Sequence, residues 1–563
     1  MSNIATKTAK RTSAAAVAGL TPYTGTFGRE QIIHLLKRTM FGAKPSDVAF
    51  FETRTLQQTL DILLAPSPVP ATTPVKHYFP IPNNTTTADP DPNITPGTAW
   101  VNDIWGQLSD GGRRESLKSW WIGQMVNQDR NIIEKMVLFW HNHFATELSD
   151  GGWSNEGYFH HLKLREFAMG NLKQFVRAIT LDPHMLRYLN GRANRKTAPD
   201  ENYARELQEL FCVGKGAGSG YTEDDVKAAA RLLTGFNIVN TNPTALPPVP
   251  QPTYSFTLGQ HDTTAKQFSA FYGNRLIAGR NTATAGEDEL TDLLDMIFAT
   301  SEVAKFICRK LYTYFVYYDI TPIVETTVIE PLADLFRQNG YQIRPIVETL
   351  LKSDHFFEVG QKGCVIKSPM DFVVGAVREF GNDLSTSDYT QYYSLWRNLV
   401  SQVSNQGQNL GDPPNVAGWQ AYYQIPLFHE MWINTDTLPT RMKWMNGYLG
   451  SITLAKLSQT AVASFVVKPD FLGFTSSFGT NAAATDTLTN SALQILYRMD
   501  VTQRQKDVFK AILENRVTTA GTWAALWATY VSTPTNTVNT TEVYARLLRY
   551  YRAITTLPEY QLS

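Results

Sequence analysis

The sequence predicts a mainly α-helical protein, a large multi-helix globular body with long loop insertions rich in Pro, Thr and Asn. Three observations predict this fold class. Apolar residues recur at helical spacing over much of the chain, helix-start signals precede several of these stretches, and breaker-rich segments separate them. The chain has 563 residues, 43% hydrophobic and 12% aromatic, and exceeds what one core usually fills. Either subdomains or a single helical body with insertions is therefore expected.

The chain begins with an entry segment, two helices and a loop. Residues 1–28 are expected to be flexible. Apolar side chains at helical spacing predict a helix over 29–40 that ends at Gly42, and Pro45 opens the next helix. The stretch 65–98 is rich in Pro, Thr and Asn and has neither a helical nor a strand period. It is predicted to be a loop insertion.

Helical signals dominate the next part of the chain. Asp182 followed by Pro183 is typical of a helix start, because proline is favoured at the first helical position. Thr222 and Asp225 have the spacing of a capping box ahead of an apolar run. Residues 237–275 form a second Pro- and Thr-rich insertion, which is compatible with a short β-hairpin.

Helices are predicted again over 287–357, with the clearest apolar spacing at 300–315, and over 369–380. Residues 405–434 contain too many breakers for a regular element. The expected organisation after the entry segment is a helical core over 29–456, a Thr/Ser/Ala/Gly-rich connector over 457–490 and a helical section over 491–563.

The charge balance and the cysteines narrow the class of protein. Lys+Arg and Asp+Glu both total 51, so the formal net charge is zero and no basic field attracts a phosphate backbone. Nucleic acid is therefore not an expected partner. Three scattered cysteines do not form a disulfide framework or a Cys-type zinc site. The short apolar run at 14–20 is not a convincing signal peptide, and no stretch approaches the roughly 20 apolar residues of a membrane helix. A soluble chain is expected, in a compartment that the sequence leaves open.

Several motifs follow one another along the chain. They are His34-Leu-Leu-Lys-Arg-Thr-Met-Phe-Gly42, Phe139-Trp-His-Asn-His-Phe144, Asp200-Glu-Asn-Tyr-Ala-Arg-Glu-Leu-Gln-Glu-Leu210, Tyr221-Thr-Glu-Asp-Asp-Val226, Leu233-Thr-Gly-Phe236, Lys367-Ser-Pro369 and Pro413-Pro-Asn-Val-Ala-Gly-Trp419. From about residue 29 onwards, the chain resembles the bacterial family catalogued as domain of unknown function 1800. The resemblance implies no reaction, and relatives often look exported. Relatives often carry a His-containing segment after the acidic helix, where this chain has Phe211-Cys212 and lacks that candidate ligand.

Two histidines two residues apart, His141 and His143, are candidate metal ligands. On a strand they would share a face, whereas on a helix they would lie about 200° apart. If the motif ends a helix and turns, both neutral imidazoles could converge on a metal. The alternative is that Trp140 and Phe144 are core anchors and that the histidines are ordinary core or surface groups.

The acidic helix at 200–210 supplies a second set of candidate ligands. Glu206 and Glu209 are neighbours on one helix face. Adjacent carboxylates repel, and a cation or a shared proton between them relieves the repulsion. The alternative is an ordinary surface ion pair between Arg205 and Glu209.

Two hypotheses follow. The first is a metal-dependent enzyme, hydrolytic or oxidative, acting on an undetermined substrate. In it a divalent metal of undetermined identity is bound by His141, His143, Glu206 and Glu209, and the proton-transfer group is Glu201 or His261. The second is a non-catalytic helical binding or assembly protein, whose aromatic-rich surface docks a protein partner or a polysaccharide. No nucleophile elbow, H-E-x-x-H motif or phosphate loop occurs, which disfavours serine hydrolases, zincins and P-loop enzymes.

Overall fold

The structure is a computed structural model, and it confirms the mainly α-helical class. The residues that it describes are 19–66, 69–70, 72–78, 89–103, 105–216, 218–239, 251–382, 384, 388–424, 427–456, 463–515 and 521–563.

The helices in the first half of the chain are α1 (Arg29–Thr39), α2 (Pro45–Phe51), α3 (Leu56–Leu63), α4 (Gln107–Val126), α5 (Ile133–His143), α6 (Ser154–Glu166), α7 (Leu172–Thr180), α8 (Pro183–Tyr188), α9 (Asn202–Glu206), α10 (Glu223–Leu232) and α11 (Ala285–Phe298). Those in the second half are α12 (Ser301–Phe315), α13 (Pro322–Val324), α14 (Glu330–Gln338), α15 (Ile343–Lys352), α16 (Asp354–Phe357), α17 (Pro369–Phe380), α18 (Tyr389–Asn405), α19 (Thr437–Gly450), α20 (Phe471–Ser476), α21 (Thr485–Leu496), α22 (Gln503–Glu514), α23 (Trp523–Ser532) and α24 (Thr537–Thr555).

Helix starts follow the predicted capping chemistry. The Thr222 hydroxyl accepts a hydrogen bond from the backbone N–H of Asp225 ahead of α10, which confirms the capping box. The Asp182 side chain likewise accepts from the N–H of Met185 at the start of α8. The helix predicted over 369–380 is α17, with the same limits.

The described strands form three two-stranded antiparallel sheets: β1 (Phe236–Val239) with β2 (Thr253–Phe256), β3 (Lys266–Gln267) with β4 (Leu276–Ile277), and β5 (Ile452–Ala455) with β6 (Ser464–Val467). Phe236 lies opposite Phe256 in the first pair. Strands β1, β2 and β3 fall largely within the insertion predicted over 237–275, so the expected hairpin character is confirmed.

The connector predicted over 457–490 contains regular structure. Strand β6, helix α20 and the beginning of α21 lie within it. Asp470 caps α20 by accepting from the N–H of Gly473, and Phe471 is fully buried at the start of that helix. The Thr, Ser and Gly content of this stretch has low helix propensity and therefore did not predict these helices, which tertiary packing stabilises.

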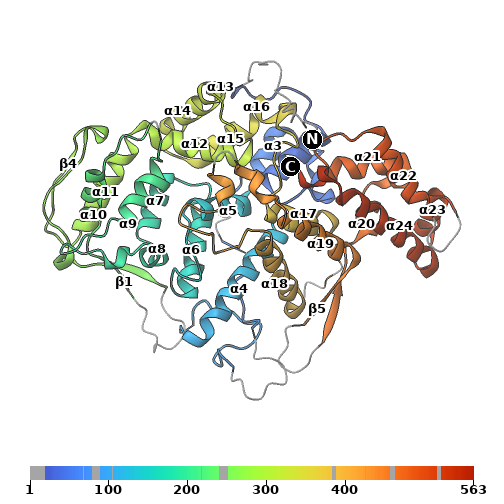
Figure 1. The fold of residues 1–563 in the computed structure, drawn as a ribbon, viewed down its shortest axis with the longest axis horizontal. Helices are drawn as coiled ribbons and strands as arrows, with labels where there is room; N and C mark the ends of the chain where they lie inside the picture. Colours follow the sequence, from blue (N-terminus) through green and yellow to red (C-terminus); the bar gives the residue numbers. More distant parts are fainter. Residues whose placement is uncertain are drawn as a thin grey trace, which may run out of the picture.

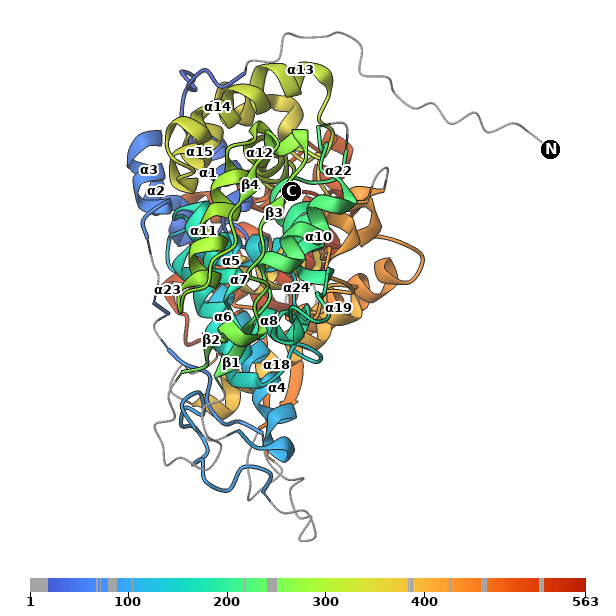
Figure 2. The same cartoon turned by 90° about the vertical axis from the view of Figure 1, so that its left-hand side faces the viewer.

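Segments distant in sequence meet at the middle of the molecule. Figure 1 shows α5 and α17 at the centre, α7 to α12 on one side and α20 to α24 on the other. The N-terminal helix α3 packs against α15, and α4 packs along α18, which extends toward one end of the molecule in Figure 2. No described helix is long and apolar enough to span a bilayer.

The end of α5 packs closely against the Pro413–Trp419 motif, and the contact is made at Gly418. The Trp419 N–H donates to Asn142 Oδ1 over 2.8 Å. Gly418 has φ +89°, and a Cβ placed there would lie 2.3 Å from Asn142 Oδ1 and 2.5 Å from the Asn142 carbonyl oxygen. Only glycine allows this close approach without strain.

We predict that Gly418→Ala lowers the free energy of unfolding by about 2–4 kcal/mol, because left-handed backbone strain and a steric clash add up. The control is Gly407→Ala, which has φ +96° and open space around its Cβ. That variant carries the backbone strain alone, at about 1–2 kcal/mol. Urea unfolding measures the free energy of unfolding of both variants. Equal losses of stability in the two variants would contradict the proposed clash at Gly418.

Candidate functional site

His143 is the last residue of α5, and its ring meets the end of the acidic segment. Its Nε2–H donates to the Phe211 carbonyl over 3.1 Å, which places the proton on Nε2. Its Nδ1 therefore accepts a hydrogen bond from Lys310 Nζ of α12 over 3.0 Å. The structure thus brings one of the two predicted histidines to the segment that follows α9.

The carbonyls that His143 and Lys310 bind belong to a π-helix. Residues Leu207–Cys212 (η2) continue α9 with i to i+5 hydrogen bonding. The last carbonyls of such a turn lack partners within the helix, and His143 and Lys310 cover those of Phe211 and Leu210. Burial lowers the pKa of Lys310 to about 7. Sequence reasoning missed this lysine, because Lys305 and Arg309 of the same helix are also cations and nothing in the sequence distinguishes Lys310 from them.

His141 faces the opposite side of α5, as the helical spacing requires. It lies edge-on to Trp121, with ring centroids 5.0 Å apart, and near Trp419, with centroids 5.6 Å apart. Trp121 also contacts His161 of α6. The two predicted histidines therefore belong to different environments.

His141 is one member of a cluster of four buried histidines. The others are His160, His161 and His184. Each is at most 3% exposed. Asp182 accepts a hydrogen bond from His160 Nδ1 over 3.0 Å, and the rings of His160 and His184 have centroids 5.3 Å apart.

Most ring nitrogens of this histidine cluster have no hydrogen-bond partner within the described part of the chain. These are Nε2 of His141 and His160, and both nitrogens of His161 and His184. Burial lowers the pKa of His141 and of His184 to about 3, so both imidazoles are neutral at physiological pH. Unpartnered buried nitrogens are unusual in folded proteins. They could not be predicted from the sequence, because the four rings come from three different helices.

The predicted glutamates are engaged in ion pairs or shielded by neighbours. Arg205 Nη2 lies 3.1 Å from Glu201 Oε2, and Lys215 Nζ lies 3.1 Å from Glu209 Oε1. Burial, and then the charge of Glu209, raises the pKa of Glu206. The repulsion expected between the two carboxylates is therefore present, while Arg205 and Lys215 compensate part of it.

His261 is held in a separate buried group. Its Nδ1 lies 2.9 Å from the Thr234 carbonyl, and its Nε2 lies 3.3 Å from Glu289 Oε1. The neighbouring residue Asp262 accepts a hydrogen bond from Arg231 over 2.7 Å. These contacts orient His261 toward the carboxylate of α11.

Among the described residues, no group of three or more His, Cys, Asp or Glu side chains is placed to hold a metal ion. His143 reaches the acidic segment through a backbone carbonyl, and His141 lies on the opposite face of α5. The metal set His141, His143, Glu206 and Glu209, and the proton-transfer roles of Glu201 and His261, stay predictions.

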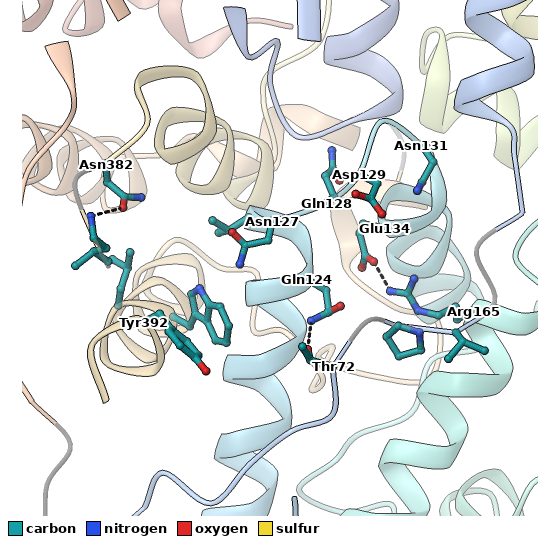
Figure 3. Close-up of a pocket in the computed structure, with 16 residues that line it drawn as sticks. Thr72, Gln124, Asn127, Gln128, Asp129, Asn131, Glu134, Arg165, Asn382 and Tyr392 are labelled. Carbon is teal, nitrogen blue, oxygen red and sulfur yellow. Dashed lines mark hydrogen bonds and ion pairs between the residues drawn. The ribbon is translucent and has the colours of Figure 1, made fainter. Parts of the chain in front are cut away.

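A partly polar pocket lies between α4, α5, α6 and α18, with a volume of about 380 Å³. Figure 3 shows the side chains that line it, which come from these helices and from the neighbouring loops. Five of the 16 residues that line it carry amide side chains. They are Gln124, Asn127, Gln128, Asn131 and Asn382.

One charged pair forms part of the pocket wall. Arg165 of α6 donates to Glu134 Oε1 of α5, as drawn in Figure 3. The second oxygen, Glu134 Oε2, has no hydrogen-bond partner among the described residues, and neither polar atom of the Gln128 side chain has one. Burial raises the pKa of Glu134. The pocket wall therefore contains buried polar atoms that no described residue satisfies.

Aromatic rings form the opposite wall. Trp396 and Tyr392 of α18 line the pocket, with ring centroids 4.6 Å apart. A Cβ at Gly123 of α4 would lie 2.6 Å from the indole of Trp396. The glycine thus allows the indole to lie against α4 and fixes one side of the pocket. Sequence analysis did not single out these residues, because they come from separate helices and the connecting loops.

Fold and site define a mainly helical protein with a polar, aromatic-walled pocket and a buried histidine cluster. The model of the family described as protein of unknown function DUF1800 matches residues 34–562, so the chain belongs to this family. Searches found no match among curated proteins. They found none among solved structures either.

We predict that acidification destabilises the fold through the histidine cluster. The unfolded chain protonates a histidine below about pH 6.5, whereas folded His184 stays neutral down to about pH 3. The free energy of unfolding is therefore unaffected by His184 above pH 6.5 and decreases as the pH falls toward 3. At pH 5 the decrease that His184 causes is up to about 2 kcal/mol. Urea unfolding between pH 7 and pH 5, with a chelator present, should show a smaller loss for His184→Phe than for the wild type. An identical loss would show that this ring contributes nothing.

Proposed function

We propose that the protein binds a neutral carbohydrate in the pocket of Figure 3. The observation that carries this proposal is the combination of five amide side chains with a two-ring aromatic wall in one 380 Å³ pocket. The volume lies within the range of pockets that hold small ligands. The proposal gives the sequence-based binding hypothesis a definite site and ligand class.

Amide side chains suit hydroxyl-rich ligands. Each amide offers two donors and an acceptor, and each sugar hydroxyl can both donate and accept. The side-chain oxygen and nitrogen of Gln128 are buried without partners among the described residues, and they gain most from such a ligand. The Gln124 amide already donates to the Thr72 hydroxyl over 3.0 Å, which holds its oxygen in place.

The aromatic wall suits the other character of a sugar ring, its flat C–H face. Trp396 is 7% exposed, so little of its surface is open, and half-buried Tyr392 extends the same wall. Aromatic rings provide a large apolar surface with little loss of conformational entropy.

The charges of the pocket favour an uncharged ligand. Arg165 neutralises Glu134, and the remaining charged side chain of the lining, Asp129, is a carboxylate. An anionic polymer would meet that carboxylate without a free cation in the lining. A neutral oligosaccharide is not repelled by this carboxylate and needs no cation to pair with.

The test is isothermal titration of the full chain with neutral hexasaccharides of the β-1,4-glucan, α-1,4-glucan, β-1,3-glucan and β-1,4-mannan types. We expect at least one to bind. Tyr392→Ala and Asn127→Ala should each weaken that binding about tenfold, because each removes a contact worth about 1–1.5 kcal/mol.

The matched control is Gln391→Ala, on the same helix beside Tyr392 but outside the pocket lining. It should leave affinity unchanged. Absence of binding to all four sugars, or equal weakening by the control, would overturn the proposal. Binding of polygalacturonate in preference to the neutral sugars would overturn the charge argument.

The metal-dependent enzyme is a second proposal, and the observation that favours it is the unpartnered nitrogens of the histidine cluster. Neutral imidazole is the form in which histidine binds metals. No coordinating group is formed by the described side chains as placed, so binding requires the rings to rotate.

Elemental analysis of protein purified without chelator tests the metal proposal. We expect about one divalent metal ion per chain and its loss in His141→Phe, which keeps an aromatic ring beside Trp121 and Trp419. His143→Phe, on the opposite face of α5, is the comparison. Loss of the metal in His141→Phe alone assigns it to the histidine cluster, whereas loss in both variants assigns it to the sequence-predicted site, which includes both histidines. A metal-free wild type excludes both sites.

A further inference from the structure

A second cavity, of about 40 Å³, lies at the N-terminal end of α17. It has room for a molecule of a few heavy atoms. Residues of the His34–Gly42 and Lys367–Pro369 motifs line it, together with residues that follow Trp419. The side chains that matter here are Lys37, Arg38, Lys367, Tyr422 and His429.

Lys367 is a buried amine without a counter-ion. Its side chain is 5% exposed, and its Nζ lies 3.8 Å from the centroid of the Tyr560 ring. Its backbone is fixed on both sides, because its N–H donates to the Gln561 carbonyl and its carbonyl accepts from Arg441. Within the described residues, no hydrogen bond or ion pair of its Nζ is found, whereas Lys37 is paired with Glu379 at 2.5 Å.

The charges around Lys367 come from several elements. Lys37 of α1 and Arg441 of α19 are cations, while Asp371 and Glu379 of α17 are anions. Burial, and then the charge of Lys37, lowers the pKa of Lys367 to about 7. A large share of its amine is therefore uncharged at neutral pH. Desolvation beside another cation is one way in which proteins activate a lysine nucleophile.

His429 contributes a hydrogen-bond donor to the same cavity. The Ile366 N–H donates to its Nδ1 over 3.1 Å, so the ring proton lies on Nε2. That buried Nε2 has no partner in the described part of the chain, and burial lowers the pKa of His429 to about 4. The ring is neutral and can donate to an oxygen atom in the cavity.

We propose that Lys367 is an amine nucleophile that condenses with a small 2-oxo acid in this cavity, with His429 donating to the carbonyl oxygen. Lys367 Nζ attacks the carbonyl carbon, a C–N bond forms, and the carbonyl oxygen leaves as water after taking up two protons. The product is an imine, and no oxidant or reductant is consumed.

Arg38 favours a substrate that carries a carboxylate. Its guanidinium lines the cavity and donates to the Gln361 carbonyl oxygen over 2.8 Å, to the backbone oxygen of Ser563 over 3.3 Å and to Cys364 Sγ over 3.4 Å. No carboxylate side chain pairs with it among the described residues, whereas Lys37 has Glu379. A guanidinium suits a planar carboxylate.

The experiment is reductive trapping on the full chain. Protein is incubated at pH 7 with glyoxylate and cyanoborohydride, and peptide mass spectrometry locates the carboxymethyl groups. We expect Lys367 to react at least about tenfold faster than exposed Lys443 of α19, because an ordinary lysine is almost fully protonated at this pH. The rate at Lys367 should be half-maximal near pH 7, while that at Lys443 keeps rising.

Variants separate chemistry from folding. Lys367→Arg removes the amine nucleophile and should carry no adduct at this position. His429→Phe should slow trapping at Lys367 about tenfold, while its melting temperature reports any loss of fold. Glycolaldehyde, which lacks the carboxylate, should react more slowly than glyoxylate at Lys367 relative to Lys443. Equal rates at Lys367 and Lys443 in the wild type would overturn the proposal. Equal selectivity for the two aldehydes would overturn the role of Arg38.

Discussion

The packing of the helices at the middle of the molecule depends on the charged side chains of α17. Its Glu379 binds Lys37 of α1 and the backbone N–H of Ala43, and its Asp371 binds Lys135 of α5. Removing one partner of such a buried pair leaves an uncompensated charge in the core, which costs about 3–5 kcal/mol. The pairs thus specify which helices surround α17, because an alternative packing would bury the same charges without partners.

The same helix reaches the end of α4 through its third charged residue. Arg378 donates to the carbonyl of Val126 over 2.8 Å and lies 3.3 Å from Asp47 of α2. It therefore satisfies carbonyl groups that the last turn of α4 leaves without helical partners. The loop that follows this end carries Asn127 and Gln128, and both line the polar pocket. An ion-paired helix thus fixes the position of the amide side chains.

Much of the fold is predictable because it depends on local rules. The capping box at Thr222 and the apolar spacing of α17 need only a few neighbouring residues to act, and both were predicted at the observed positions. The π-helix at Leu207–Cys212 was not predicted. It depends on Lys310 and His143, which cover its terminal carbonyls from two other helices. Local propensity carries no information about such partners.

The candidate site was less predictable for a related reason. The sequence left open whether His141 and His143 lie on a helix or on an extended segment, and α5 continuing to His143 turns them apart. His141 then joins three histidines from other helices, and Lys367 is distinctive because no counter-ion from the described residues reaches it. The spacing of residues in a motif predicts neither the grouping of the histidines nor the missing counter-ion of Lys367. A sequence shows which residues are ionisable, whereas the pairing of each one is decided by tertiary structure.

The two cavities lie toward opposite ends of α17 and differ in chemistry. Lys367 precedes its first residue, and Asn382 of the polar pocket follows its last residue by two positions. A helix of 12 residues is about 18 Å long, so a small molecule in one cavity cannot contact the other. One cavity offers neutral amides and aromatic rings, and the other a buried amine between the cations Lys37 and Arg441 and the carboxylates Asp371 and Glu379. The proposed carbohydrate binding and the proposed amine chemistry therefore depend on different side chains, and the loss of one carries no implication for the other. Coupling would require α17 itself to move, which its buried ion pairs with α1 and α5 oppose.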